Sequence, residues 1–348
     1  MVLLLAFSSF AQDANQQPLP HAPSAQKYPA QTKDASTPAA TPAPSAPQPA
    51  PAASQQPAQP SETSDDQEEK LTTIVKQVDE VNVVFTVTDK RGKFVNNLKK
   101  EDFQVIDDGK PAQAIRSFRS ETNLPLRVGL LVDASNSIRD RFKFEQEAAI
   151  EFLNQIIHQQ DQAFVLGFDT TPEVTQNFTN NTEALSKGVR MLRPGGGTAL
   201  YDAIYYACRD EIMAKDKSPI ATRRAIILLS DGDDNQSRVS REEAVEMAQK
   251  AEVIIYTIST NSSGMKLKGD KVLEHFAEET GGRSFFPFKV QDVSDAFLQI
   301  QDELRSQYAI SYKPADLQPN GKYHTIQILA DNRKYKVRAR KGYYAPLS

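Results

Sequence analysis

Hydrophobic and polar positions alternate in a segment that begins near residue 71. Val81, Val83, Phe85 and Val87 occupy every second position, which is typical of a strand that buries one face. Further strands are predicted at residues 102–106 and 112–118. Alternation returns at residues 308–312 and 335–340, and residues 323–329 form a further strand between them. Either group of strands alone would have too small a core, so we expect residues 71–122 and 306–348 to form one β-sandwich. Two separate small β units are the weaker alternative.

The intervening residues 123–305 follow a different pattern, in which short apolar runs alternate with segments of helical periodicity. This pattern predicts an α/β fold with a doubly wound, mostly parallel sheet. Asn181 and Ser240 look like helix N-caps, Glu243 gives Ser240 capping-box spacing, and Gly281 marks a helix end. Strands are expected at residues 127–133, 163–168, 224–230, 252–259 and 283–288, and helices at residues 140–159, 181–192, 199–214, 240–250, 270–279 and 291–305.

The first 70 residues carry no such pattern. Residues 1–11 form a short apolar run that ends at Ala11 and resembles a secretory signal; because basic residues are missing before it, a truncated start is also expected. Residues 12–70 are rich in Pro, Ala, Gln and Ser, which favours a disordered, extended linker. We therefore expect a secreted, periplasmic or cell-envelope protein. No other apolar run approaches the roughly 20 residues of a membrane span.

Composition and charge limit the classes of partner and of chemical site that the chain is expected to have. The 348 residues carry a net charge of -4, so no basic field argues for a nucleic-acid partner. The single Cys208 excludes an intramolecular disulfide, and its helical surroundings predict a small buried side chain. The four histidines show no metal-ligand spacing, so a histidine-based zinc site is not expected.

Oxygen-bearing side chains follow the predicted strands of the central segment. Asp133, Ser135 and Ser137 leave the strand at residues 127–133, Thr198 follows three glycines, and Asp231 ends the strand at residues 224–230. The carboxyl ends of parallel strands share one sheet edge, where ligands bind in open α/β folds. Carboxylates and hydroxyls form a hard oxygen set, which favours Mg²⁺ or Mn²⁺ over zinc.

These three pieces, D-x-S-x-S, a loop Thr and a later Asp, resemble the metal-ion-dependent adhesion site of von Willebrand factor A domains. The resemblance covers about residues 125–305 and implies an antiparallel edge strand near residues 174–178. It implies that Ser135 and Ser137 bind the metal directly and that Asp133 and Asp231 often act through water. Thr198 would bind directly in the ligand-competent state. The expected ion is Mg²⁺, with Mn²⁺ or Ca²⁺ as alternatives, and one open position would accept an acidic group of a partner.

The insertion of such a domain in a β-sandwich is similar to the inserted domain of integrin β subunits. The flanking segments also resemble bacterial von Willebrand factor A-related secreted proteins of Acidobacteria type. In this family the last helix can shift when ligand binds, which implies that ligand state changes the angle between the central domain and the sandwich.

Several residues have alternative interpretations. The site residues could be ordinary helix caps and turn formers, and the glycines before Thr198 could form a phosphate cradle, although no G-K-[ST] follows them. Asp233 and Asp234 could hold a second cation or form a solvated rim. Asp202 could accept a hydrogen bond behind the metal ligands or be a helix N-terminal charge. The basic set Lys336, Arg338 and Arg340 predicts a solvated face, or contact with an anionic polymer or an acidic partner.

The function that fits these observations is a non-enzymatic, metal-dependent protein-binding or adhesion module of the cell envelope or secretome. Its partner would be a protein or envelope ligand with an exposed acidic residue. A non-catalytic structural subunit of an envelope complex is an alternative. A Mg²⁺-dependent hydrolase is less well supported, because the D-x-D-x-T/V and G-x-S-x-G arrangements are absent from the sequence.

Overall fold

The computed structural model describes residues 80–120, 124–139, 141–215, 222–261, 263–287 and 289–347. The predicted signal and linker lie outside these residues. All described residues belong to one compact unit, Thr73–Ser348. Within them, no helix is both long and apolar enough to cross a membrane.

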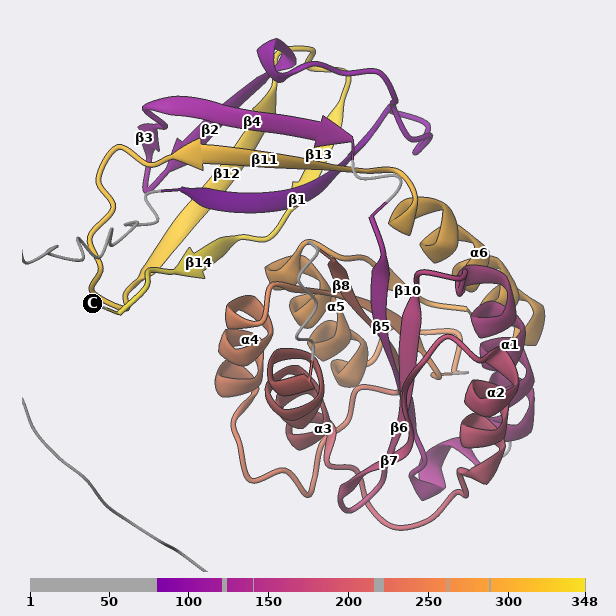
Figure 1. Cartoon of the computed structure of the whole chain (residues 1–348). Helices are drawn as coiled ribbons and strands as arrows, with labels where there is room; N and C mark the ends of the chain where they lie inside the picture. Colours follow the sequence, from indigo (N-terminus) through magenta and orange to yellow (C-terminus); the bar gives the residue numbers. More distant parts are fainter. Residues whose placement is uncertain are drawn as a thin grey trace, which may run out of the picture. The chain divides into compact units, whose positions relative to one another are not determined.

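Six strands form the central sheet, in the order β10-β9-β8-β5-β6-β7 (Figure 1). All pair in parallel except β7, which runs antiparallel to β6 at the edge. The mostly parallel fold class and the antiparallel edge strand are thus confirmed. The strand bounds are β5 Leu126–Asp133, β6 Gln162–Phe168, β7 Pro172–Thr179, β8 Arg223–Ser230, β9 Val253–Ser259 and β10 Ser284–Phe285.

Helices cover both faces of this sheet (Figure 1). One face packs against α1, α2 and α6, and the other against α3, α4 and α5. The helix bounds are α1 Phe142–Ile156, α2 Thr182–Met191, α3 Leu200–Tyr206, α4 Arg241–Lys250, α5 Lys268–Thr280 and α6 Val290–Leu304. The predicted N-caps are confirmed, because Asn181 accepts from Glu183 and Ala184 and Ser240 forms the capping box with Glu243.

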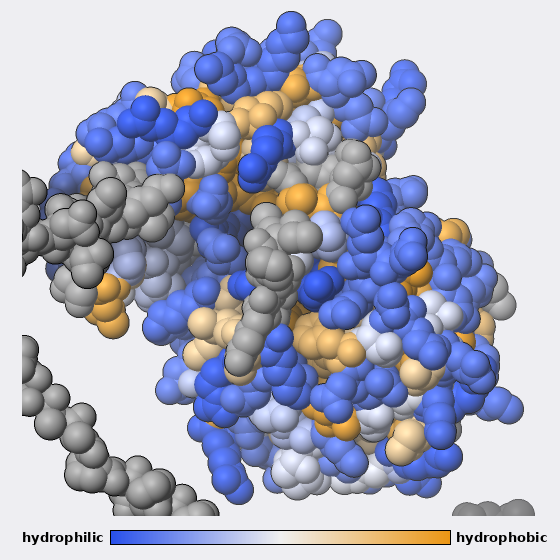
Figure 2. Space-filling model, in the orientation of Figure 1, coloured by the Kyte–Doolittle hydropathy of each residue, from blue (hydrophilic) through white to orange (hydrophobic). Residues whose placement is uncertain are grey.

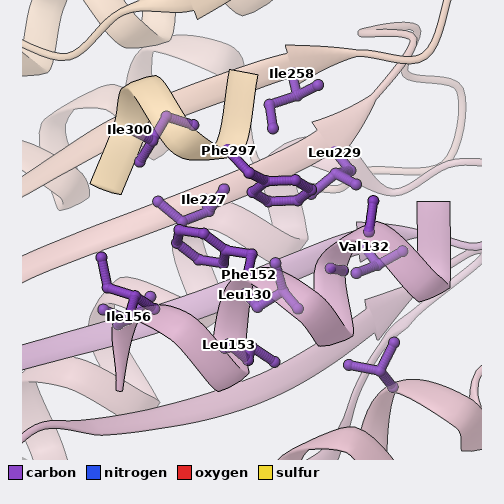
Figure 3. Close-up of a cluster of buried hydrophobic side chains, with 14 of the residues drawn as sticks. Leu130, Val132, Phe152, Leu153, Ile156, Ile227, Leu229, Ile258, Phe297 and Ile300 are labelled. Carbon is purple, nitrogen blue, oxygen red and sulfur yellow. The ribbon is translucent and has the colours of Figure 1, made fainter. Parts of the chain in front are cut away.

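Successive side chains of the central strand β5 pack against opposite faces of the sheet. Leu130 and Val132 point into the cluster under α1 and α6, where the Phe152 and Phe297 rings stack with centroids 4.7 Å apart (Figure 3). Leu131 belongs to the cluster on the other face. Burial on both faces explains why residues 128–132 of β5 form a continuous apolar run. In the view of Figure 2, hydrophilic residues cover most of the surface.

The flanking segments form two further four-stranded sheets, β13-β1-β11-β4 and β14-β12-β2-β3. Strands from the two ends of the chain pair antiparallel: β1 with β11, and β2 with β12. Their apolar faces share one cluster, in which Phe85, Phe103 and Tyr308 are buried. The strand bounds are β1 Val81–Thr88, β2 Phe103–Asp107, β3 Lys110–Pro111, β4 Ala114–Ser120, β11 Gln307–Lys313, β12 Tyr323–Ala330, β13 Lys336–Ala339 and β14 Gly342–Tyr344.

One predicted strand was too long, and one short strand was missed. The strand expected at residues 283–288 is only β10, because Pro287 lacks the N–H that would extend the ladder. The helix expected at residues 199–214 is confirmed, although its winding changes from α3 to a π-helical segment, Ala207–Met213. Strand β14 was not predicted, because three residues are too short to show an alternation. Cys208, within the π-helical segment, is fully buried as expected.

The interpretation of the basic residues in and after β13 as a solvated face was wrong for two of the three, because these two make internal contacts. Arg338 pairs with the buried carboxylate of Glu303 at the end of α6 and donates from Nε to the Gly281 carbonyl at 3.2 Å. Arg340 donates to the Asn82 carbonyl at 2.7 Å. Arg340 therefore stabilises the sandwich internally, and Arg338 links the sandwich to α6, the last helix of the central domain.

Candidate metal centre

Asp133 is the last residue of β5 and is completely buried. Its Oδ1 accepts from the Ser135 backbone N–H at 2.8 Å, and its Oδ2 accepts from Ser230 Oγ at 2.7 Å. Ser230 is the last residue of the neighbouring strand β8, so parallel pairing alone brings the two together. Both carboxylate oxygens are thereby held in fixed positions at the carboxyl edge of the sheet.

The hydroxyls of the first loop connect directly to the loop after β8. Ser135 Oγ lies 2.9 Å from Ser137 Oγ, and Ser137 Oγ donates to Asp231 Oδ2 at 2.7 Å. Ser135 is buried, whereas Ser137 is exposed and Asp231 is half-buried. Hydrogen bonds therefore link four of the five predicted residues, Asp133 among them.

Thr198 is carried by a third loop that hydrogen bonds hold beside the first. Gly195 N–H donates to the Ala134 carbonyl at 2.7 Å, and Asn136 Nδ2 donates to the Gly196 carbonyl at 3.2 Å. Gly196 has φ 63°, and a Cβ there would lie 2.6 Å from Thr170 Oγ1, so this position requires glycine.

The backbone of Thr198 is hydrogen-bonded to the loop after β8. Its N–H donates to Asn235 Oδ1 at 3.0 Å, while its carbonyl accepts from the N–H groups of Asn235 at 3.0 Å and Gln236 at 3.1 Å. Thr198 itself is 4% exposed. Its position is thus set by main-chain bonds that do not engage its hydroxyl.

The neighbouring carboxylates shape these loops. Asp234 Oδ2 accepts from Ser237 Oγ at 2.5 Å and from the Tyr201 N–H at 3.2 Å. Asp202 Oδ1 accepts from Arg238 N–H at 2.9 Å and Val239 N–H at 3.0 Å. Asp202 and Asp234 therefore cross-link α3 to the loop after β8. Asp233 is exposed, in line with a solvated rim.

Negative charge accumulates in this region without a buried cation at hydrogen-bond distance among the described residues. Burial raises the pKa of Asp133 to about 6, and the charge of Asp231 adds to the effect. Burial also raises the pKa of Glu145, on α1, to about 8, while Arg141 opposes the shift from 3.9 Å. A divalent cation would relieve this cost, because it stabilises the ionised carboxylates.

The spacing of the donor atoms matches the geometry that Mg²⁺ requires. Octahedral Mg²⁺ binds oxygen at about 2.1 Å, so adjacent ligand oxygens lie about 3.0 Å apart. The Ser135–Ser137 and Ser137–Asp231 separations of 2.9 and 2.7 Å are close to that edge length. All the oxygens are hard ligands, so the residues present fit the ion.

The interpretation of the site residues as ordinary helix caps and turn formers explains only part of this arrangement. It explains the turn in which Asp133 accepts from Ser135 N–H. However, Ser135, at the N-cap position of the 3₁₀ turn Asn136–Ile138, makes no side-chain capping bond. Ser137 contacts a residue 94 positions away instead.

Sequence reasoning missed two supporting residues. These are Ser230, which donates to Asp133, and Asn235, which accepts from the Thr198 N–H. The parallel pairing of β5 with β8 was the available signal for Ser230, since it places Ser230 beside Asp133. No feature of the sequence predicted the role of Asn235, because its contact with Thr198 depends on how two loops fold together.

Comparison with known proteins bears on the central segment. The family model of the von Willebrand factor type A domain matches residues 128–303. Bovine calcium-activated chloride channel regulator 1 is 28% identical over 180 residues, which cover 50% of this chain and 19% of that protein. An uncharacterized protein of Borreliella burgdorferi is 24% identical over 207 residues, or 57% of each chain. The chain thus spans less than two thirds of both curated relatives.

Solved structures also resemble this chain. A von Willebrand factor type A protein from Catenulispora acidiphila aligns with 73% of this chain and 76% of its own, at TM-score 0.47 and 12% identity. Proximal thread matrix protein 1 from the mussel byssus, described with a zinc-occupied MIDAS motif, aligns with 57% of this chain and 49% of its own. Its TM-score is 0.45 and its identity is 18%.

Proposed function

The chain belongs to the von Willebrand factor type A domain family, and we propose that it is a metal-dependent protein-binding module of the cell envelope or secretome. Domains of this family commonly serve adhesion or protein binding and are generally not enzymes. The partner that we propose is a protein or envelope ligand that presents an exposed acidic side chain.

The metal ligands in this proposal are Asp133, Ser135, Ser137, Thr198 and Asp231. When bound there, Mg²⁺, or Mn²⁺ or Ca²⁺ in its place, would supply a Lewis-acidic position for a carboxylate of the partner. Ser135 and Ser137 contribute neutral hydroxyls, which leave positive charge for the partner's carboxylate to neutralise. Asp133 and Asp231 provide the negative charge that favours a cation in the site.

The observation that carries the proposal is the chain of contacts Ser135–Ser137–Asp231 at 2.9 and 2.7 Å. These three side chains come from two loops of separate strands, and turn chemistry alone does not require them to meet. Their oxygens stand at the separations that an octahedral ion needs. The proposed secreted or envelope location rests on the signal-like residues 1–11.

A carboxylate-capture experiment tests this function. The full chain would be passed over immobilised peptides that differ only in one exposed Asp or Asn, in Mg²⁺ and then in EDTA. We expect binding to the Asp peptide in Mg²⁺ alone, and its loss in Ser137→Ala. Equal binding to both peptides, or binding that survives EDTA, would contradict metal-mediated capture. A structural subunit that does not require a metal would give binding that survives EDTA.

A further inference from the structure

Two carboxylates and an imidazole meet in the β-sandwich, away from the sheet edge described above. Asp107 ends β2, Asp108 follows it in the turn to β3, and His324 is the second residue of β12. One ligand atom from each residue lies within 4.8 Å of the others. His324 Nδ1 is 2.8 Å from Asp108 Oδ2 and 3.9 Å from Asp107 Oδ1.

Each carboxylate has one oxygen held by protein donors and the other turned toward His324. Asp107 Oδ2 accepts from the hydroxyls of Tyr312 at 2.6 Å and Tyr343 at 3.1 Å, which leaves Oδ1 on the histidine side. Asp108 Oδ1 accepts from Thr325 N–H at 2.8 Å and Thr325 Oγ1 at 3.1 Å. Metal-binding carboxylates are commonly oriented by such outer hydrogen bonds.

His324 is buried and its ring is held by packing, but its ring nitrogens lack hydrogen-bond partners among the described residues. It is 8% exposed, and its ring stacks on Tyr343 with centroids 5.2 Å apart. Neither ring nitrogen makes an aligned hydrogen bond to any described residue, although Nδ1 lies close to Asp108 Oδ2. A buried imidazole without hydrogen-bond partners is costly. A bound cation would give both Nδ1 and Asp108 Oδ2 a common partner.

A cavity of about 140 Å³ adjoins the three residues. It is also lined by Lys110, Ala315, Asp316, Gln318 and Asn320. Three carboxylates and one ammonium therefore border the space, so its charge favours a cation. The cavity is large enough to hold water beside an ion.

We propose that Asp107, Asp108 and His324 bind a divalent transition-metal ion, for which Zn²⁺ is the best match. Zn²⁺ takes nitrogen and carboxylate ligands at about 2.0–2.2 Å, so two tetrahedral ligands lie about 3.4 Å apart. The observed 2.8 and 3.9 Å separations bracket that value. Three protein ligands leave a fourth position open toward the cavity, whereas Mg²⁺ would favour an all-oxygen set.

This inference is independent of the proposed Mg²⁺ function, because the two sites share no residue. The competing explanation is a simple ion pair between a protonated His324 and the two carboxylates. The two explanations differ in one measurable property, which is high-affinity binding of Zn²⁺ at neutral pH.

The test is calorimetric titration of Zn²⁺ into the full chain at pH 7, with millimolar Mg²⁺ present to compete at the oxygen site. We expect one Zn²⁺ equivalent, and at least a tenfold loss of affinity in His324→Gln. Asp108→Asn should show the same loss; because Asp108 is half-exposed and Asn tolerates its φ of 47°, this second variant is the one expected to keep its fold. His275→Gln, on α5, is the matched control and should bind as the wild type does.

The proposal would be overturned by either of two results. One is the absence of the Zn²⁺ equivalent in the wild type. The other is unchanged Zn²⁺ affinity in Asp108→Asn with a wild-type far-ultraviolet spectrum. Binding of Co²⁺ gives a separate readout, because four-coordinate Co²⁺ absorbs strongly in the visible range, and His324→Gln should abolish that absorption.

Discussion

Ser137 Oγ donates a hydrogen bond to Asp231 Oδ2 at 2.7 Å, although 94 residues separate them in the chain. The pairing of β5 with β8 explains this contact, because Val132 and Leu229 are register partners just before the two loops begin. The proposed metal centre therefore depends on two adjacent strands ending together. The predictions below test the ligands, the loops and the charges around that centre.

The hydroxyl of Thr198 should matter for capture of a carboxylate but little for folding. Its main chain holds the loop through Asn235, so Thr198→Ala leaves those bonds in place. We expect Mg²⁺-dependent binding of an Asp peptide to weaken at least tenfold, with a melting temperature close to that of the wild type. Thr198→Ser keeps a hydroxyl and should restore most of the binding. Failure of Thr198→Ser to differ from Thr198→Ala would argue against direct ligation.

Gly232, beside Asp231, should tolerate no side chain. It has φ 82°, and a Cβ there would lie 2.1 Å from the Gly269 carbonyl oxygen. Gly264 has a similar φ of 74° but open space around it, so Gly264→Ala measures the conformational cost alone. We expect about 1 kcal/mol from Gly264→Ala and at least about 3 kcal/mol from Gly232→Ala in urea denaturation. Equal losses would show that the loop can move away from Gly269.

Glu145 should make metal-free protein less stable as pH rises. Burial raises its pKa to about 8 from an ordinary 4.5, and both its oxygens lack hydrogen-bond partners among the described residues. Between these values the folded state holds a proton that the unfolded state has lost, so stability falls with increasing pH and the full cost remains above pH 8. That cost is on the order of a few kcal/mol.

Glu145→Gln removes this titration while keeping the shape of the side chain. Relative to the wild type, the variant should gain stability as the pH is raised from about 5 to about 8.5, measured by urea denaturation with EDTA. Glu147→Gln, exposed on the same helix, is the control and should follow the wild type. A parallel pH dependence in Glu145→Gln and the wild type would refute the assignment.

Arg338 should stabilise the junction between α6 and the sandwich. Glu303 is 1% exposed and pairs with Arg338, so Arg338→Gln would remove the cation that forms an ion pair with this buried carboxylate. Because Arg338 is partly exposed, we expect a loss of about 2–3 kcal/mol, part of which Glu303→Gln should recover in the double variant. Lys336→Gln, exposed on the same strand, should cost less than about 0.5 kcal/mol. An equal effect of the two single substitutions Arg338→Gln and Lys336→Gln would contradict the role of this pair.

Much of the architecture was accessible from sequence because it depends on local periodicity. The apolar run of β5 and the alternation of Val81, Val83 and Phe85 each reflect which faces of a strand are buried. The capping residues Asn181 and Ser240 act within three positions of themselves. The five proposed metal ligands were identified because each follows a strand or a glycine-rich loop.

The contacts that escaped prediction join residues far apart in the chain. Arg338 looked solvated because Glu303 lies on another element, and Asp107 and His324 are separated by more than half of the chain. Histidine spacing therefore carried no signal for the cluster in the sandwich. Such contacts depend on strand register, which sequence periodicity constrains only to within one face of a sheet.

The most direct test of the proposed metal centre is calorimetric titration of Mg²⁺ into the metal-free full chain, beside Asp133→Ala and Ser137→Ala. Because these residues are proposed to supply ligand oxygens around one point, the wild type should bind one Mg²⁺ saturably. Both variants should lose that binding. Absence of saturable Mg²⁺ binding in the wild type, or equal affinity in folded Ser137→Ala, would contradict the site.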